Sequence, residues 1–230
     1  NTGLELLNKN EFSTHLSASI AHSMLATVLM AKGDYQSSID HLHKSLDIKL
    51  SKSVVDSIDL CPTLLNLGIA HFRLKEWQEA QDYYERVVRI QQARKGEFHP
   101  DLINTYLNLG AYYQNLKQYD LALSYYERIE TIFLNEEDKS HFLLANSFLN
   151  RGLIYKDLDR PDQALLYLRL ALGQLTKHYP EHPELAKCLL SIGSIHYEQD
   201  EFSLAEMHFS RSVAVLTPSD SSKGISHIPV

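Results

Sequence analysis

A sequence pattern that returns about every 42 residues places the strongest constraint on how this chain folds. Each copy has a small residue at one phase and a second small residue twelve positions later. A fixed period of this size is typical of arrays of stacked units, because one unit alone cannot bury its apolar face. The five pairs of small residues are Ala26 and Ser38, Gly68 and Ala80, Gly110 and Ala122, Gly152 and Ala164, and Gly193 and Ala205.

Large apolar residues around each pair recur at the spacing of an α-helix. In the second copy Leu64 and Leu67 precede the turn, and Tyr84 and Val87 follow it. Two antiparallel helices approach closely only where the facing side chains are small. Gly costs roughly 1 kcal/mol in a helix interior relative to Ala, so its return at one phase indicates a packing role. Each copy therefore predicts a helix-turn-helix unit.

The repeated pattern resembles the tetratricopeptide repeat, over roughly residues 19–217. Leu-Asn-Leu-Gly ends at Gly68 and again at Gly110, and these two copies continue with an aromatic residue, Trp77 or Tyr119, three positions before Ala. The 42-residue period and the starts His99-Pro100-Asp101 and His182-Pro183-Glu184 resemble the cargo-binding repeats of kinesin light chains. Two starts depart from this pattern: His141-Phe142 keeps only the His, and Ser57-Ile58 keeps neither residue.

We therefore expect an all-α fold, a right-handed α-solenoid of five helix-turn-helix repeats in one continuous domain. Residues 1–12 are expected to form an N-terminal lead or cap, and residues 218–230 a flexible C-terminal tail. The repeats span about 13–52, 54–95, 97–135, 139–179 and 181–217. The helices are expected near 13–32 and 35–50, 54–74 and 77–93, 100–116 and 119–134, 139–158 and 161–178, and 183–199 and 202–216.

The resemblance implies that the first helices of the repeats line a concave groove that holds extended peptides. Two positions before the small residue stand Asn66, Asn108 and Asn150, while Ser191 continues the row and Met24 interrupts it. A carboxamide offers one acceptor and two donors and can clasp a peptide bond. The alternative is that these side chains only hydrogen-bond neighbouring helices.

Further residues fall beside this row on the same helices. Asn104 and Asn146 lie one turn before Asn108 and Asn150. Neighbouring leucines are expected to form apolar pockets or to belong to the core, and three cations favour an acidic or phosphorylated peptide, although Asp157 and Glu198 dilute their field. The predicted groove residues are Asn66, Arg73, Asn104, Leu107, Asn108, Asn146, Leu149, Asn150, Lys156, Lys187 and Ser191.

Arg151 departs from the repeat pattern. It stands where the other copies have Leu25, Leu67, Leu109 and Ile192. Either its aliphatic stem packs while the guanidinium reaches solvent, or the side chain pairs with an acid in a neighbouring repeat. We favour the first arrangement.

Charge, cysteines and hydropathy narrow the function classes. The net charge of −7 argues against a general nucleic-acid or membrane-surface binder. Cys61 and Cys188 lie in different repeats, which makes a disulfide unfavourable and favours a reducing, cytoplasmic location. No apolar run is long enough for membrane insertion. Because the chain starts at Asn1 without Met, we expect it to be a piece of a longer protein.

Twelve histidines raise the possibility of a metal or catalytic site. His41 and His43 point to opposite sides of a helix, and His71 and His196 occupy a position that is aromatic in other repeats. No metal-binding, phosphate-binding or nucleophile motif is present. We therefore expect no enzyme activity, no cofactor and no metal.

The expected function is that of an adaptor that binds an extended protein segment with apolar and acidic residues. The kinesin light chain resemblance implies cargo segments that combine tryptophan with acidic residues. One alternative is a regulatory, peptide-sensing domain that controls an attached or partner domain. Another is a self-associating scaffold whose C-terminal tail or end repeat docks on a second copy.

Overall fold

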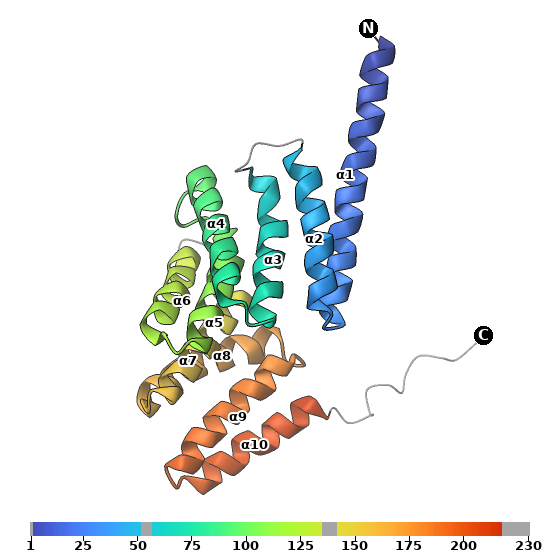
Figure 1. Cartoon of the computed structure of the whole chain (residues 1–230). Coiled ribbons are helices and arrows are strands. Elements are labelled where there is room, and N and C mark those ends of the chain that lie inside the picture. Colours follow the sequence, from blue (N-terminus) through green and yellow to red (C-terminus); the bar gives the residue numbers. More distant parts are fainter. Residues whose placement is uncertain (1, 52–56, 135–141, 218–230) are drawn as a thin grey trace, which may run out of the picture. The chain divides into compact units, whose positions relative to one another are not determined.

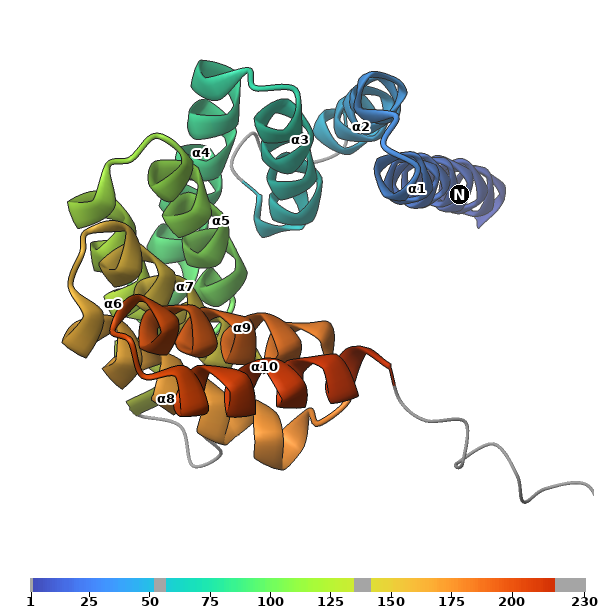
Figure 2. The same ribbon diagram turned by 90° about the horizontal axis from the view of Figure 1, so that it is seen from below.

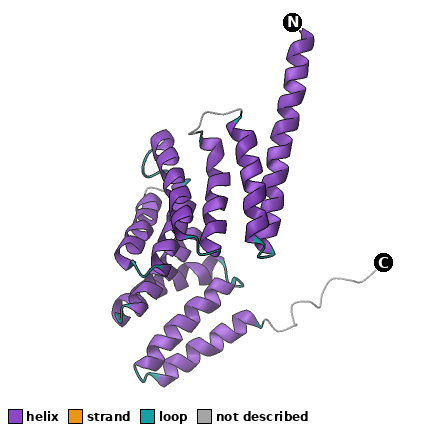
Figure 3. Ribbon diagram, in the orientation of Figure 1, coloured by secondary structure: helices purple, strands orange, loops and turns teal. Residues whose placement is uncertain are grey.

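A computed structural model describes residues 2–51, 57–134 and 142–217, with side chains from residue 16 onward. These residues form ten α-helices and one short 3-10 helix, and no strand occurs among them (Figures 1 and 3). The predicted all-α repeat fold is therefore confirmed. The elements are α1 (Thr2–Ala31), α2 (Tyr35–Leu50), η1 (Ile58–Leu60), α3 (Cys61–Arg73), α4 (Trp77–Lys95), α5 (Leu102–Asn115), α6 (Tyr119–Leu134), α7 (Phe142–Asp157), α8 (Pro161–His178), α9 (Pro183–Glu198) and α10 (Phe202–Leu216).

Most predicted helix bounds agree closely with the structure, but the starts of the first and third predicted helices do not. The helix predicted from residue 54 begins only at Cys61, because Ser57 is extended and a 3-10 turn precedes the helix. Helices α2, α6, α8 and α10 have the predicted bounds. The predicted start of the first helix near residue 13 is wrong, because α1 begins at Thr2. Whether the first residues act as a cap stays a prediction, since their side chains lie outside the described part. The predicted tail, residues 218–230, also lies outside it.

The contacts divide the chain into two compact units, residues 1–116 and 117–230. The boundary falls in the turn of the third repeat, so the single continuous domain stays a prediction. In the unit of residues 1–116, α1, α3 and α5 lie along one side, with α2 and α4 on the other (Figure 2). In the unit of residues 117–230, α7 and α9 are each packed against their own second helix, α8 and α10.

The repeated glycines lie where two helices of a hairpin approach closely, as predicted. A Cβ on Gly68 would lie 2.6 Å from Cε1 of the Tyr84 ring. The same atom on Gly152 would lie 2.6 Å from Leu168 Cγ, and on Gly193 it would meet Phe209 at 2.7 Å. The large side chain on the second helix therefore fills the space that the missing side chain leaves.

Each hairpin turns through one residue in the left-handed region, seven positions after the small residue. Gly33 occupies this place in the first hairpin with φ 80°. The later hairpins use non-glycine residues with φ between 55° and 64°, namely Lys75, Lys117, Asp159 and Asp200. This conformation suits the residue after a helix C-terminus, and Gly33 adopts it without steric cost.

The two His-Pro repeat starts have a physical role at the helix N-termini. His182 Nδ1 accepts a hydrogen bond from the backbone N–H of Glu184 at 3.2 Å, and His99 Nδ1 accepts one from Asp101 at 3.2 Å. Each ring thereby satisfies one of the backbone donors that a helix start leaves unpaired.

Candidate functional site

A cleft of about 210 Å³ lies between the first helices of the first two repeats. It contains Asn66, the first member of the predicted carboxamide row. Helix α1 contributes four further side chains, and one lysine comes from α2. The lining residues are Ile20, Ser23, Met24, Thr27, Lys49, Pro62, Thr63 and Asn66.

The cleft combines exposed apolar surface with a carboxamide that is available for binding. Ile20 is 50% exposed and Met24 is 66% exposed. The side chain of Asn66 is half-buried and has no hydrogen-bond partner among the described residues. Met24, which interrupts the row in sequence, lines this cleft together with Asn66.

Lys49 was not recognised from the sequence as part of this site. Its Nζ donates to Thr63 Oγ1 at 2.8 Å and to the Asp59 carbonyl at 3.1 Å. Burial lowers the pKa of Lys49, and the charge of Asp59 opposes this effect. The ammonium therefore mainly holds α2 to α3, and its position in the last turn of α2 was the only sequence indication of it.

The third repeat contributes predicted groove residues from α5. Asn108 Nδ2 donates to the Asn104 carbonyl at 2.8 Å, within the same helix, so one of its donors is already used. Asn104 is exposed and Leu107 is half-buried. Arg73, at the end of α3, is also exposed.

In the unit of residues 117–230, the predicted polar residues are partly engaged. Asn150 hydrogen-bonds the phenol of Tyr126 on α6; burial raises the pKa of Tyr126, and this hydrogen bond opposes the rise. Ser191 Oγ donates to the Lys187 carbonyl at 2.9 Å within α9. Asn146 is half-buried without a hydrogen-bond partner among the described side chains and backbone. The alternative of hydrogen bonding to a neighbouring helix thus applies to Asn150.

Three further predicted groove residues are either buried in the core or paired with an acidic side chain. Leu149 is fully buried, so its prediction as a groove contact is wrong and it belongs to the core. Lys156 Nζ lies 3.2 Å from Glu198 Oε1 and links α7 to α9. Lys187 lies 3.5 Å from Glu184 on its own helix and remains exposed.

Arg151 pairs with acids of the preceding repeat, and the favoured prediction that it reaches solvent is wrong. The residue is only 3% exposed. Its guanidinium donates to Glu130 Oε2 at 2.5 Å, to Glu127 Oε1 at 3.2 Å and to the Tyr167 hydroxyl at 2.6 Å. It also lies 4.0 Å over the Tyr167 ring. The cation is buried because these partners replace its hydration.

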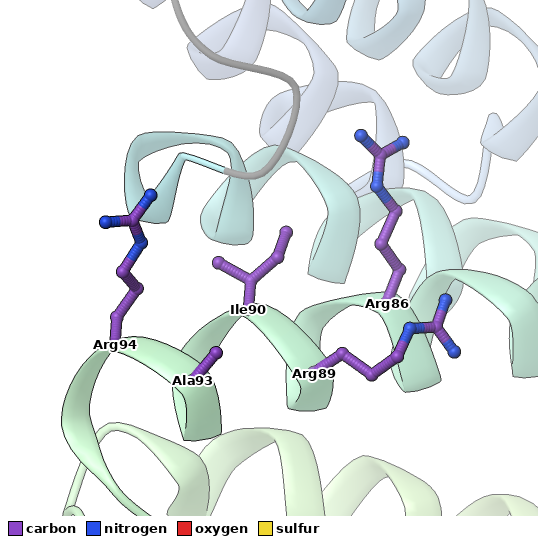
Figure 4. Close-up of a pocket in the computed structure, with 5 residues that line it drawn as sticks. All are labelled: Arg86, Arg89, Ile90, Ala93 and Arg94. Atoms are coloured by element: carbon purple, nitrogen blue, oxygen red, sulfur yellow. The ribbon is translucent and has the colours of Figure 1, made fainter.

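A wider cavity, of about 550 Å³, lies along α4, outside the predicted groove. It is lined by Arg86, Arg89, Ile90, Ala93 and Arg94. Figure 4 shows Arg86, Ile90 and Arg94 pointing to the same side of this second helix. Arginine clusters attract carboxylates and phosphates, which makes this cavity the main alternative location for an anionic group.

The histidines and cysteines lie in packed positions. The ring of His71 stacks on Tyr83 at 5.4 Å and that of His196 on His208 at 5.6 Å, as predicted for the aromatic position. Cys61 and Cys188 are free and buried, and burial raises the pKa of the Cys61 thiol to about 11 and that of Cys188 to about 12. Among the described residues no three potential ligands come together at a metal-binding distance.

Comparison with protein families decides the class of the fold. The profile described as Tetratricopeptide repeat matches residues 16–93, 59–135, 101–177 and 143–217. The chain belongs to the tetratricopeptide repeat family. These overlapping matches include all five predicted hairpins, and tetratricopeptide repeats are protein-interaction modules. No curated protein matches the sequence.

Solved structures with the same fold share little sequence with this tetratricopeptide chain. BtubC (BKLC) from P. vanneervenii has a TM-score of 0.79 at 17% identity, over 98% of this chain and 89% of that one. Podosopora anserina TPR-like repeats named after kinesin light chain have a TM-score of 0.70 at 18% identity, over 92% and 99% of the two chains. Aspartyl phosphate phosphatase F from Bacillus subtilis has a TM-score of 0.78 at 18% identity, over 96% and 55%.

These similarities establish the fold alone, because the compared proteins share less than a fifth of their sequence with this chain and are named for different roles. The fold is typical of non-catalytic interaction scaffolds, although one of these proteins is named a phosphatase. Among the described helices, none has the length and apolar composition needed to cross a membrane.

Proposed function

We propose that this tetratricopeptide chain is an adaptor that binds an extended segment of a partner protein along its first helices. The observation that carries the proposal is the cleft between α1 and α3. There the free carboxamide of Asn66 lies beside the exposed side chains of Ile20 and Met24. A carboxamide can accept from one backbone N–H and donate to one backbone C=O of a bound peptide.

The cleft favours an apolar side chain on the bound segment. Burying apolar surface against Ile20 and Met24 contributes about 25 cal/mol per Å². The flexible thioether of Met24 adapts to side chains of different shape. Exposed Arg73 in the same unit favours an acidic residue elsewhere in the segment, because no ion pair within the described residues occupies it.

The most specific form of the proposal is a cargo adaptor similar to kinesin light chain. It is supported by the 42-residue period, by the His-Pro repeat starts and by the fold shared with the Podosopora anserina repeats. Exposed Arg73 supports an acidic ligand, whereas Lys156 is paired with Glu198 and exposed Lys187 is paired with Glu184.

A peptide-array screen with purified protein tests the proposal. We expect wild type to retain a common short motif, and Met24→Glu and Asn66→Ala each to weaken its binding about tenfold or more, which is about 1.4 kcal/mol. Leu166→Glu is the matched control for Met24→Glu, since Leu166 is 55% exposed on the second helix α8. Gln36→Ala, on α2, is the control for the carboxamide.

Two results would contradict this location of the site. Binding that survives both cleft substitutions but is lost in Arg94→Ala would move the site to the cavity along α4. Failure of the array to retain any short motif would contradict an extended-peptide ligand. Circular dichroism of each variant verifies that helicity is unchanged.

A further inference from the structure

The outer face of α1 exposes positions that are buried in every later repeat. Leu25 is 44% exposed and Val28 is 51% exposed. In the later repeats the Leu25 position is at most 3% exposed; its residues are Leu67, Leu109, Arg151 and Ile192. The Val28 position is at most 2% exposed there; its residues are Ala70, Tyr112, Ile154 and Ile195. In the later repeats a second helix of the preceding repeat covers this face, as the contact of Arg151 with α6 demonstrates.

The outer face of α10 exposes the complementary positions. Leu216 is 56% exposed, whereas Leu175 and Phe133, at the same position of earlier repeats, are buried. Val213 is 58% exposed and corresponds to Glu130, the partner of Arg151. Among the described helices of its unit, α10 packs against α9 alone. No described residue therefore covers the side of α10 on which Val213 and Leu216 lie.

Contacts inside the array show which of these positions meet. Glu130 contacts Arg151, one repeat later, which pairs the Val213 position with the Leu25 position. Thr105 Oγ1 donates to Gln91 Oε1 at 3.0 Å, and Lys49 donates to Thr63. Gln91 and Lys49 stand at the repeat position of Leu216, and Thr105 and Thr63 stand at the repeat position of Ala21. The two contacts therefore show that the Leu216 position meets the Ala21 position of the next repeat, and Ala21 is also exposed.

We infer that copies of this chain associate end to end, with α1 of one copy stacked on α10 of the next as one repeat stacks on another. Val213 then contacts Leu25 of the second copy, and Leu216 contacts its Ala21. All four are apolar, so stacking removes exposed apolar surface of the kind that marks an interaction site. A second copy is the favoured occupant, because one chain carries both halves of the contact.

The contact is heterologous, since two different surfaces meet. Such contacts give closed rings or open chains of copies, and the average mass grows with concentration. This inference does not rest on the proposed peptide-binding function, because the cleft between α1 and α3 is lined by Ile20, Ser23, Met24 and Thr27 of α1, whereas Leu25 and Val28 are not among its lining residues.

Sedimentation velocity over an about hundredfold concentration range tests the association. We expect the weight-average mass of wild type to at least double across the series, and Leu25→Arg and Val213→Glu each to remain at the monomer mass. A buried unpaired charge in the contact opposes stacking. Leu166→Glu, an exposed apolar residue on α8, is the matched control and should associate as wild type does.

A charge-exchange experiment tests the register itself. An equimolar mixture of the Leu25→Arg and Val213→Glu variants should regain mass, because the unmodified Val213 and Leu25 faces form one wild-type contact in every mixed pair; only the double variant makes every contact an Arg–Glu pair like Arg151–Glu130 and so tests the register. The double variant should regain it as well. A monomeric wild type, single variants that still associate, or a mixture that stays monomeric would each overturn the inference.

Deleting residues 218–230 separates this contact from association through the C-terminal tail. We expect the truncated chain to associate as wild type does. Loss of association in the deletion, with full association in Val213→Glu, would assign the contact to the tail instead. Binding of the peptide motif should be unchanged in Val213→Glu, so failure of either idea can be recognised separately.

Discussion

The α1–α2 and α3–α4 hairpins join equivalent positions by different chemistry. In α1–α2 the hydroxyl of Ser45 lies 2.8 Å from Ser23 Oγ and 3.0 Å from Ser19 Oγ, and His22 Nδ1 lies 2.8 Å from His41 Nδ1. In α3–α4 the corresponding positions are largely apolar, with Val87 in place of Ser45, and the Tyr84 ring fills the space over Gly68.

The difference shows that the repeat constrains the size and the sequence position of its interior side chains more strongly than it constrains their polarity. A polar side chain is accepted at an interior position when a partner for it lies across the interface. Ser45 and Arg151 are two such residues, and each stands where most other repeats carry an apolar side chain. The following predictions test size first and chemistry afterwards.

The largest expected effect comes from Gly68→Leu. Because a Cβ already lies 2.6 Å from the Tyr84 ring, the larger side chain should separate α3 from α4. We expect the free energy of unfolding, measured by urea denaturation, to fall by about 3 kcal/mol. Gly173→Leu is the control, since nothing lies within 4 Å of its Cβ position. Equal losses at both sites would refute the role of close approach.

Arg151→Ala is expected to lower the free energy of unfolding by about 2 kcal/mol, because Glu127, Glu130 and Tyr167 lose their shared partner. Their partial exposure keeps the loss below that of a fully buried pair. Arg151→Leu restores the residue type of the other repeats and should differ from wild type by less than about 1 kcal/mol. Equal destabilisation by both changes would mean that the ion pairs are essential to this contact.

Ser45→Ala should cost about 1 kcal/mol, since Ser19 and Ser23 both lose a hydroxyl partner in the first hairpin. Thermal and urea unfolding of the variant measure the loss. Ser210→Ala serves as the comparison, because Ser210 is exposed on α10 and has no side-chain hydrogen bond among the described residues. No difference between the two variants would show that the polar contacts of α1–α2 add nothing to its stability.

The smallest expected effect is a pH dependence of the last hairpin. Burial lowers the pKa of His208, and His196, Arg211 and Arg169 lower it further. The folded state therefore favours neutral His208: its contribution is complete above about pH 6.5 and is lost as the pH falls below that value. Unfolding measured between neutral and mildly acidic pH should show the loss, and His208→Tyr, the residue of three other repeats, should reduce it. An unchanged profile in that variant would assign the pH dependence to other groups.

The repeat pattern was sufficient to predict the hairpins but not every site residue. Periodic small residues and helical spacing depend on local geometry, so Gly68, Gly152 and Gly193 were recognised correctly as close contacts. To assign the groove residues correctly, one must know which side of each helix faces solvent, and the sequence does not give this. Leu149 was misassigned because it occupies the same repeat position as Leu107, and only packing decides that Leu107 is half-buried while Leu149 is fully covered.

The amino-acid sequence by itself determined the fold class, the number of hairpins and the place of most helix ends, because these depend on spacing within a few turns. Only the tertiary structure decided how individual polar groups are satisfied. Arg151 is buried because Glu127 and Glu130 lie across the interface, and Asn66 remains available because no described residue hydrogen-bonds its side chain. Such pairings join residues of different helices, and a linear period does not specify which side chains meet there.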